Sequence, residues 1–151
     1  MSSAYKWCDN SLGTVFKVSD LLWNNVSSPR AQFCGWLAWK GRLKTSSFLQ
    51  RIRVLSDEAN VSCIFCNEEV ESVNHVLLLC PFAWKVWAHM LNWWGLQWVQ
   101  PGTVLCLFDW WVGTKLKKQE RVIWKAMPLA VIWSIWKLRN DCIFNGNHQN
   151  L

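Results

Sequence analysis

Apolar side chains recur every three or four positions along much of this chain, which is the period of one face of an α-helix. The segment 30–40 has this period and stops at Gly41, a residue that suits the left-handed backbone just past a helix end. Its apolar positions are Phe33, Trp36, Leu37 and Trp39. A second helix is predicted after Thr45, whose hydroxyl can cap the first turn. Pro81, which suits the first position of a helix, opens a third helix over residues 81–94.

The pattern near the N-terminus is less regular. Within residues 5–18, a turn signal at 9–13 (DNSLG) precedes a short apolar stretch. The apolar residues of this stretch are Val15, Phe16 and Val18. This arrangement predicts a short hairpin or a strand that leads into a helix. Ser19 or Asp20 can then cap a helix that runs through Val26 and ends before Ser27.

The C-terminal third holds the most apolar part of the chain. The apolar run 104–112 leaves the choice between helix and strand open. A long helix is predicted from about Leu116 to Asn140, with a kink or break near Pro128, which lacks the backbone N–H of a helix interior. The most apolar window, residues 127–136, is too short to span a membrane, which takes about 20 apolar residues. We therefore expect a buried helix and no membrane partner.

Four residues of metal-binding type lie within the segment Cys63–Cys80, which reads CIFCNEEVESVNHVLLLC. Cys63 and Cys66 form a C-x2-C pair, and His75 and Cys80 supply a second pair. Three thiolates and one imidazole are the ligands of a closed tetrahedral Zn²⁺ site, which leaves no coordination position for water. The alternative is a packed core histidine beside ordinary thiols, and the joint spacing favours the metal. The other cysteines, interpreted as ordinary buried thiols, are Cys8, Cys34, Cys106 and Cys142.

These features predict a mainly α fold: a small helical domain organised around a Cys-Cys-His-Cys zinc knuckle, to which the N-terminal hairpin would add a short strand pair. The 151 residues divide into an N-terminal extension (1–29), a zinc-binding core (30–95) and a C-terminal Trp-rich helical region (96–151). Fourteen tryptophans and a net charge of +6 predict apolar surface that a partner covers, and suit an anionic partner. Seven cysteines, an odd number, and an N-terminus without a secretory signal favour an intracellular location, nuclear or cytoplasmic, over secretion.

Nearly the whole chain carries short motifs that occur in the same order in one known family. They are Trp7, GTVFKV (13–18), Phe33–Trp36 with Leu37–Trp39, RLKT (42–45), Glu71 ahead of His75, CPFAWKVW (80–87) and WSIWKLRNDCIF (133–144). In these motifs the chain resembles the zinc-binding domain that follows the reverse transcriptase in plant LINE-type (non-LTR) retrotransposon polyproteins. The resemblance implies a Zn²⁺-binding domain that holds nucleic acid, and we expect the chain to be a detached fragment of such a polyprotein.

Basic residues are the candidate contacts for nucleic acid. The loop between Cys66 and His75 holds three glutamates and no basic residue, so phosphate is not expected to bind there. Two basic series lie elsewhere: Lys40, Arg42, Lys44, Arg51 and Arg53, and Lys115, Lys117, Lys118, Arg121 and Lys125. Trp36 or Trp39, beside the first series, can stack on unpaired bases of RNA or single-stranded DNA. The alternative is that these charges are solvated helix faces and these tryptophans belong to the core.

Catalysis by this chain alone is not expected. A polymerase holds two Mg²⁺ ions with paired carboxylates, and the Y-x-D-D segment that carries them in the family has no counterpart here. Two functions remain. In the first, the chain is a non-catalytic accessory module that positions RNA or DNA for a reverse transcriptase. In the second, it is a zinc-stapled, Trp-rich helical interaction domain that docks on the polymerase or ribonuclease H domain without binding nucleic acid.

Overall fold

The computed structural model describes residues 12–146, and within them the protein is built from helices. The elements are α1 (Leu12–Leu22), α2 (Pro29–Trp39), α3 (Ser46–Arg51), the π-helical turn η2 (His75–Leu79), α4 (Pro81–Trp93), α5 (Val104–Gly113) and α6 (Arg121–Asn145). The described residues form no β-strand, and Ser62 and Val70 make an isolated antiparallel bridge. None of the described helices has the length and apolar character needed to cross a membrane. The predicted mainly α fold is confirmed.

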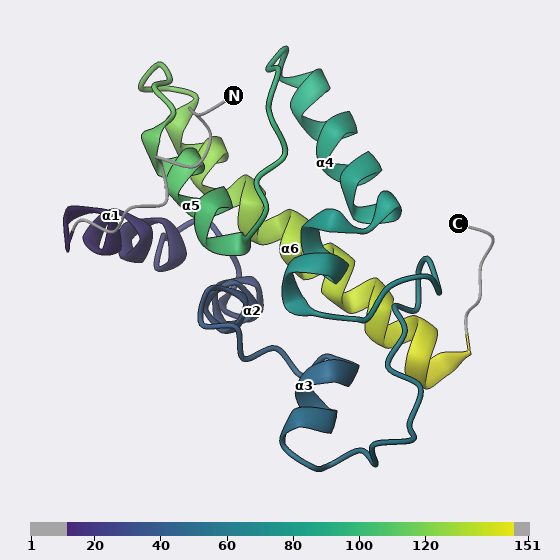
Figure 1. Ribbon diagram of the computed structural model, residues 1–151. Helices are drawn as coiled ribbons and strands as arrows, with labels where there is room; N and C mark the ends of the chain where they lie inside the picture. The colour runs from purple at the N-terminus through teal and green to yellow at the C-terminus, as the bar shows by residue number, and fades with distance from the viewer. Residues whose placement is uncertain (1–11, 147–151) are drawn as a thin grey trace.

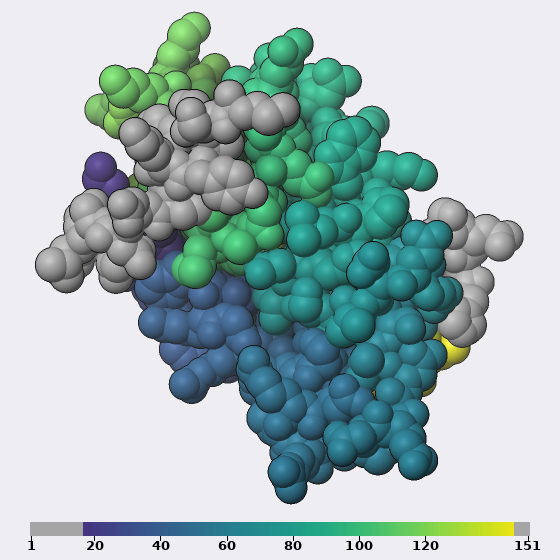
Figure 2. Space-filling view, in the orientation of Figure 1, coloured from purple at the N-terminus to yellow at the C-terminus, as the bar shows by residue number. Residues whose placement is uncertain are grey.

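Helix α6 contacts α1, α2, α4 and the turn η2. It runs diagonally through the molecule in Figure 1, and segments that precede it in the sequence cover most of it from the side seen in Figure 2. Its buried residues recur every three or four positions and are Trp124, Pro128, Leu129, Ile132, Ile135, Arg139 and Cys142. The hydrophobic core is continuous from Val18 in α1 to Ile135 in α6. The division into segments 1–29, 30–95 and 96–151 stays a prediction.

Pro128 lies inside a continuous α6, so of the two predicted alternatives, a kink or a break, the break does not occur. A proline leaves the carbonyl of the residue four positions earlier, here Trp124, without its helical donor. The indole Nε1–H of Trp111 in α5 donates to that carbonyl at 2.8 Å, and the Nε1–H of Trp124 donates to the carbonyl of Trp111 at 3.2 Å. The two rings stack with their centroids 4.1 Å apart. The helix begins at Arg121 and ends at Asn145, later than predicted at both ends.

Helix α2 packs on α6 through small residues. Its buried positions are Ala31, Cys34, Gly35 and Ala38. A Cβ atom added to Gly35 would lie 2.4 Å from Leu129 Cδ2 and 3.3 Å from Leu22 Cδ2, so the glycine allows the close approach of the helices. The predicted helix is confirmed, but the buried face is not the one that large residues predict, since Phe33 is 55% exposed. The contact with α6 has room only for small side chains. Phe33 therefore stays at the surface, while Trp36, Leu37 and Trp39 are partly buried and pack at the edge of the core.

The prediction of an N-terminal hairpin is wrong for the residues that the structure describes. Leu12–Leu22 form α1, so the residues predicted to form the second strand are helical. The predicted capping residues Ser19 and Asp20 lie inside this helix, and residues 5–11 lie outside the described part. Within residues 17–22, the part of α1 whose burial is described, the buried residues are Val18, Leu21 and Leu22. These residues are three and four positions apart, which is the spacing of a helix and not of the strand predicted from the short apolar stretch.

Sequence signals at several other helix ends are confirmed. The Thr45 hydroxyl accepts the backbone N–H of Phe48 at 3.3 Å and so caps α3. Gly41 and Gly95 follow α2 and α4 with φ angles of 63° and 68°, the left-handed conformation that ends a helix. The apolar run 104–112, left open between helix and strand, is helical and forms most of α5. Local signals of this kind therefore place most helix boundaries correctly.

The cysteines outside the metal-binding segment are not all alike. Cys34 is a buried thiol, as predicted, and burial raises its pKa to about 12. Cys142 is buried on α6. Cys106 is disulfide-bonded, so its interpretation as an ordinary thiol is wrong. Pairing requires two cysteines to approach within a few ångströms in the fold, and spacing along the chain carries no such signal. Cys8 lies outside the described residues.

Candidate metal centre

Four donor atoms converge at one place in the structure. The Sγ atoms of Cys63, Cys66 and Cys80 and a ring nitrogen of His75 lie within 4.8 Å of one another. The Sγ atoms of Cys63 and Cys80 are 3.9 Å apart, and Sγ of Cys66 is 3.3 Å from Nε2 of His75. In a tetrahedral site with Zn–S bonds of about 2.3 Å and Zn–N bonds of about 2.0–2.1 Å, two sulfurs lie about 3.8 Å apart and a sulfur and a nitrogen about 3.6 Å apart. The structure brings the four predicted ligands together at a spacing that fits one metal ion.

A tight loop carries the C-x2-C pair. The backbone N–H of Cys63 donates to the carbonyl of Glu69 at 2.7 Å, and the N–H of Asn67 donates to the carbonyl of Cys63 at 2.8 Å. Asn67 has a φ angle of 57°, a left-handed conformation that asparagine adopts more readily than most residues. The ring of Phe65 packs against Phe82 in the first turn of α4, with ring centroids 4.6 Å apart. These contacts hold the loop against the start of α4.

A π-helical turn positions the second pair of ligands. The Ser72 hydroxyl accepts the backbone N–H of His75 at 3.1 Å, and the N–H of Cys80 donates to the carbonyl of His75 at 2.7 Å. This last bond joins residues five apart, one more than in an α-helix, and such turns are frequent at functional sites. It explains why ligands separated by five positions face the same centre. Pro81 then opens α4, as predicted, and places Cys80 directly before its first turn.

Burial and hydrogen bonds change the acidity of the candidate ligands. Cys63 and Cys80 are fully buried, His75 is nearly so and Cys66 is half-buried. The Cys63 thiol donates to Sγ of Cys80, which raises the pKa of Cys63 and lowers the pKa of Cys80. Backbone amides in the first turn of α4 also lower the pKa of Cys80. Burial lowers the pKa of His75 below its ordinary value, so the ring is neutral at pH 7 and keeps a lone pair for a metal.

A buried ion pair ties the metal loop to α6. Glu71 is fully buried and Arg139 is 4% exposed. The Nε of Arg139 donates to Oε2 of Glu71 at 3.1 Å, and its Nη2 donates to Oε1 at 2.5 Å. Two parallel bonds between guanidinium and carboxylate form one of the strongest polar contacts in proteins. Oε1 also accepts the backbone N–H and the hydroxyl of Ser46 at the start of α3. One carboxylate therefore joins the metal loop to two helices.

Sequence reasoning does not find this pair. It groups Glu71 with Glu68 and Glu69 as three acids of one loop. In the structure Glu68 and Glu69 are exposed, whereas Glu71 is buried. Arg139 lies far along the chain in the C-terminal motif, and no spacing rule connects residues 68 positions apart. The available signal is that both residues lie in motifs of the family resemblance.

The predicted basic residues are all exposed. The first series begins at the end of α2 and ends just past α3, and its members are Lys40, Arg42, Lys44, Arg51 and Arg53. The second series, within residues 115–125, spans the connection between α5 and α6 and lies at the opposite end of the molecule from α3 in Figure 1. The structure therefore does not bring the two series together. Of the two predicted stacking residues, half-buried Trp39 has the ammonium of Lys40 over its ring, 4.2 Å from the centroid.

A mainly helical domain whose Cys₃His cluster leaves no open ligand position belongs to the class of small domains suited to one structural metal ion. The model of one family, described as zinc-binding in reverse transcriptase, matches residues 1–87, more than half of the chain, and the chain belongs to this family. The match includes the whole metal cluster, whereas α5 and α6 lie beyond it. No curated protein and no solved structure matches the chain.

Proposed function

We propose that the chain is a non-catalytic accessory domain of a reverse transcriptase and that zinc stabilises its fold. The reverse transcriptase would be that of a plant LINE-type (non-LTR) retrotransposon. The convergence of Cys63, Cys66, His75 and Cys80 in a member of a zinc-binding family carries this proposal. Thiolate and imidazole ligands favour zinc over hard cations such as Mg²⁺. The proposed ligands need reduced thiols, which a cell interior, nuclear or cytoplasmic, maintains. The disulfide-bonded Cys106 is not one of these ligands.

Zinc would act in this domain as a structural cross-link. Bound zinc supplies folding free energy, because it holds four side chains on one centre that the unfolded chain lacks. With every ligand position taken by protein, no water is activated and no catalytic step is assigned to the ion. The chain's own residues then hold the loop on α4 through Phe65 and on α6 through Glu71.

Elemental mass spectrometry of the purified protein tests the metal. We expect one zinc ion per chain and its loss on dialysis against a chelator. Limited proteolysis run in parallel should show faster cleavage within residues 60–90 after zinc removal, because this segment contains all four proposed ligands. Protein that contains no zinc, or zinc that is removed without any change in cleavage, would contradict a structural metal.

We propose in addition that the module contacts RNA or single-stranded DNA through its first basic series, Lys40, Arg42, Lys44, Arg51 and Arg53. Between Asp20 and Asp57 the chain has no acidic residue, and its six basic residues, Arg30 and this series, are all exposed. The attraction between exposed cations and phosphate extends over a Debye length of about 8 Å at physiological salt. The loop that carries Glu68 and Glu69 is not part of this surface.

The salt dependence of binding tests the phosphate contact. On a single-stranded oligonucleotide, Arg42→Gln should reduce the slope of log K against log salt by about 0.7, because one phosphate contact and its released counterion are lost. Lys85→Gln, which removes an exposed lysine of α4 instead, is the matched control and should keep the wild-type slope. Absence of binding at low salt, or equal slopes for the two variants, would contradict the contact.

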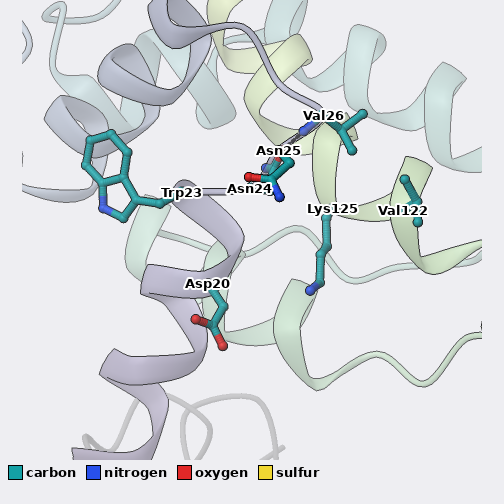
Figure 3. A pocket seen from close by; sticks show the side chains of 7 residues that line it. All are labelled: Asp20, Trp23, Asn24, Asn25, Val26, Val122 and Lys125. Carbon is teal, nitrogen blue, oxygen red and sulfur yellow. Dashed lines mark hydrogen bonds between the residues drawn. The ribbon is translucent and has the colours of Figure 1, made fainter.

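The second candidate function is docking on the polymerase or ribonuclease H domain without binding nucleic acid. Apolar side chains at the surface favour it: a hollow of about 320 Å³ between the end of α1 and the start of α6 is lined by Trp23, Val26 and Val122, each more than half exposed (Figure 3). Asp20 and Lys125 lie on two sides of the same hollow. A stable complex with purified reverse transcriptase that Trp23→Ser weakens, together with no oligonucleotide binding, would favour this function over the first.

A further inference from the structure

We infer that the outer face of α2 is a stacking site for unpaired bases, with Phe33 as its platform. This inference rests on the proposed contact with single-stranded nucleic acid and adds the surface that would hold the bases. The rings of Phe33 and Trp36 stack on each other, with centroids 5.9 Å apart and an angle of 23° between their planes. Phe33 is 55% exposed, so a base can continue this stack on the ring.

The burial pattern of α2 differs at Phe33 from the one that side-chain size predicts. The face that packs on α6 consists of Ala31, Cys34, Gly35 and Ala38, whereas a phenylalanine on the same helix stays at the surface. An exposed aromatic ring forgoes the stabilisation that its burial would contribute. Phe33 is also outside the hydrophobic core of the domain. A ligand that covers the ring accounts for its position.

Basic residues frame this platform along the helix. Positions 33, 36 and 40 follow one another at three and four, so they lie in one row on α2. Arg30 precedes the row, Lys40 ends it, and both are exposed. At 1.5 Å per residue the two cations are about 15 Å apart along the helix axis, with the aromatic pair between them. A strand that lies along α2 would place phosphates near the cations and a base on the ring.

Trp39 is a weaker platform than Phe33, although it is one of the two tryptophans that the sequence singles out. Its ring is half-buried, and the ammonium of Lys40 lies over it. That face is already occupied by a cation, whereas the ring of Phe33 has only Trp36 as an aromatic neighbour among the described contacts. The structure therefore moves the stacking site one turn or more toward the start of α2.

The charge around Phe33 selects nucleic acid as the occupant. Residues 21–56 contain six exposed basic residues and no acidic one, and charge of a single sign suits a polyanion. An exposed ring among cations is the combination that binds single strands, since cations track the backbone and rings stack on bases of any sequence. Bases inside a duplex are stacked on each other, so the site would take an unpaired strand.

Fluorescence anisotropy with the zinc-loaded full chain tests the site on two probes, a labelled oligo-dT and an abasic strand of equal length. Phe33→Ala should raise the Kd for oligo-dT about tenfold, within the range of measured base–aromatic stacking. The Kd for the abasic strand and the salt slope should stay at the wild-type values, because no cation is removed. Phe33→Tyr keeps a ring and should restore binding. Trp93→Ala removes a tryptophan that is 79% exposed on α4 and should change nothing.

Each result separates the stacking site from the phosphate contact. If Phe33→Ala binds oligo-dT as tightly as the wild type, the stacking site is wrong and the phosphate contact stands. An equal loss on the abasic strand also overturns the site, because the effect of the ring would then not depend on bases. If the wild-type protein binds neither strand at low salt, the proposed nucleic-acid function fails together with the site. Thermal unfolding of Phe33→Ala at the wild-type temperature checks that the fold is intact.

Discussion

Glu71 and Arg139, 68 residues apart in the sequence, form a two-point ion pair inside the core. Glu71 lies in the loop between the two halves of the metal cluster, and Arg139 lies in the second half of α6. The guanidinium also lies over the ring of Trp136, 4.8 Å from its centroid. The pair joins the segment that matches the zinc-binding family, residues 1–87, to a helix beyond that match.

Removal of one partner should destabilise the protein strongly. Arg139→Ala leaves the carboxylate of Glu71 buried without a counter-charge, and we expect a loss of about 3–5 kcal/mol in the free energy of unfolding, measured by urea denaturation. Glu71→Gln combined with Arg139→Met should cost clearly less, because no unpaired charge stays buried. Lys137→Ala, which removes an exposed cation of the same helix, is the control and should stay within about 0.5 kcal/mol. A loss in Arg139→Ala no larger than in this control would show that the pair is dispensable.

Loss of one proposed ligand should open the metal loop. Cys63→Ser and His75→Ala each leave an incomplete donor set, and we expect a lower zinc content and faster proteolysis of residues 60–90. Cys34→Ala removes a buried cysteine outside the cluster, and this variant should have the zinc content of the wild type. Wild-type cleavage of both ligand variants would count against a structural metal.

Acidification should destabilise the fold through His75. Burial lowers the pKa of this residue from its ordinary value of 6.5, so the unfolded chain binds a proton at a higher pH than the folded chain does. The contribution of His75 to stability is therefore complete above 6.5 and decreases as the pH falls from 6.5 toward the folded pKa. Zinc release strengthens the same trend, because protons and metal compete for the ligands.

The midpoint of thermal unfolding, measured at a series of pH values, tests this dependence. The midpoint should decrease on acidification, and this decrease should be much smaller in His75→Gln than in the wild type. His89→Gln, which replaces an exposed histidine of α4, should behave as the wild type. An unchanged pH dependence in His75→Gln would assign the effect to other groups.

The indole of Trp111 should compensate for the missing N–H of Pro128. Trp111→Phe leaves the buried carbonyl of Trp124 without a donor, and we expect a cost of about 1–3 kcal/mol in the free energy of unfolding. Pro128→Ala restores a helical N–H, so the same substitution of Trp111 should cost less in the Pro128→Ala background. A double-mutant cycle by chemical denaturation measures this coupling. Strictly additive costs would show that the indole does not replace the helical donor.

Local signals account for the features that the sequence predicts correctly. The cap at Thr45 and the left-handed Gly41 depend only on neighbouring residues, and the structure has both. The proposed ligands also lie close in sequence, within Cys63–Cys80, so one loop and one π-helical turn bring them together. Distant parts of the fold contribute little to their convergence.

Contacts between distant segments account for what the sequence could not predict. Both faces of α2 carry apolar residues, and the buried face is decided by the fit of Gly35 against Leu129 of another helix. Pro128 stays inside a continuous helix while an indole from α5 supplies a donor. In the sequence Glu71 looks like one of several solvated acids of a loop, and only the fold brings Arg139 to it. Each of these features depends on a partner that no local period reveals.

The stacked rings of Trp111 and Trp124 also give the protein an internal optical probe. Two indole chromophores 4.1 Å apart, with an angle of 16° between their planes, couple their excited states, so their ultraviolet spectrum differs from that of separated indoles. Both rings lie beyond residues 1–87. The signal would therefore report whether α5 and α6 stay docked while zinc is titrated into the other part of the chain, without any attached label.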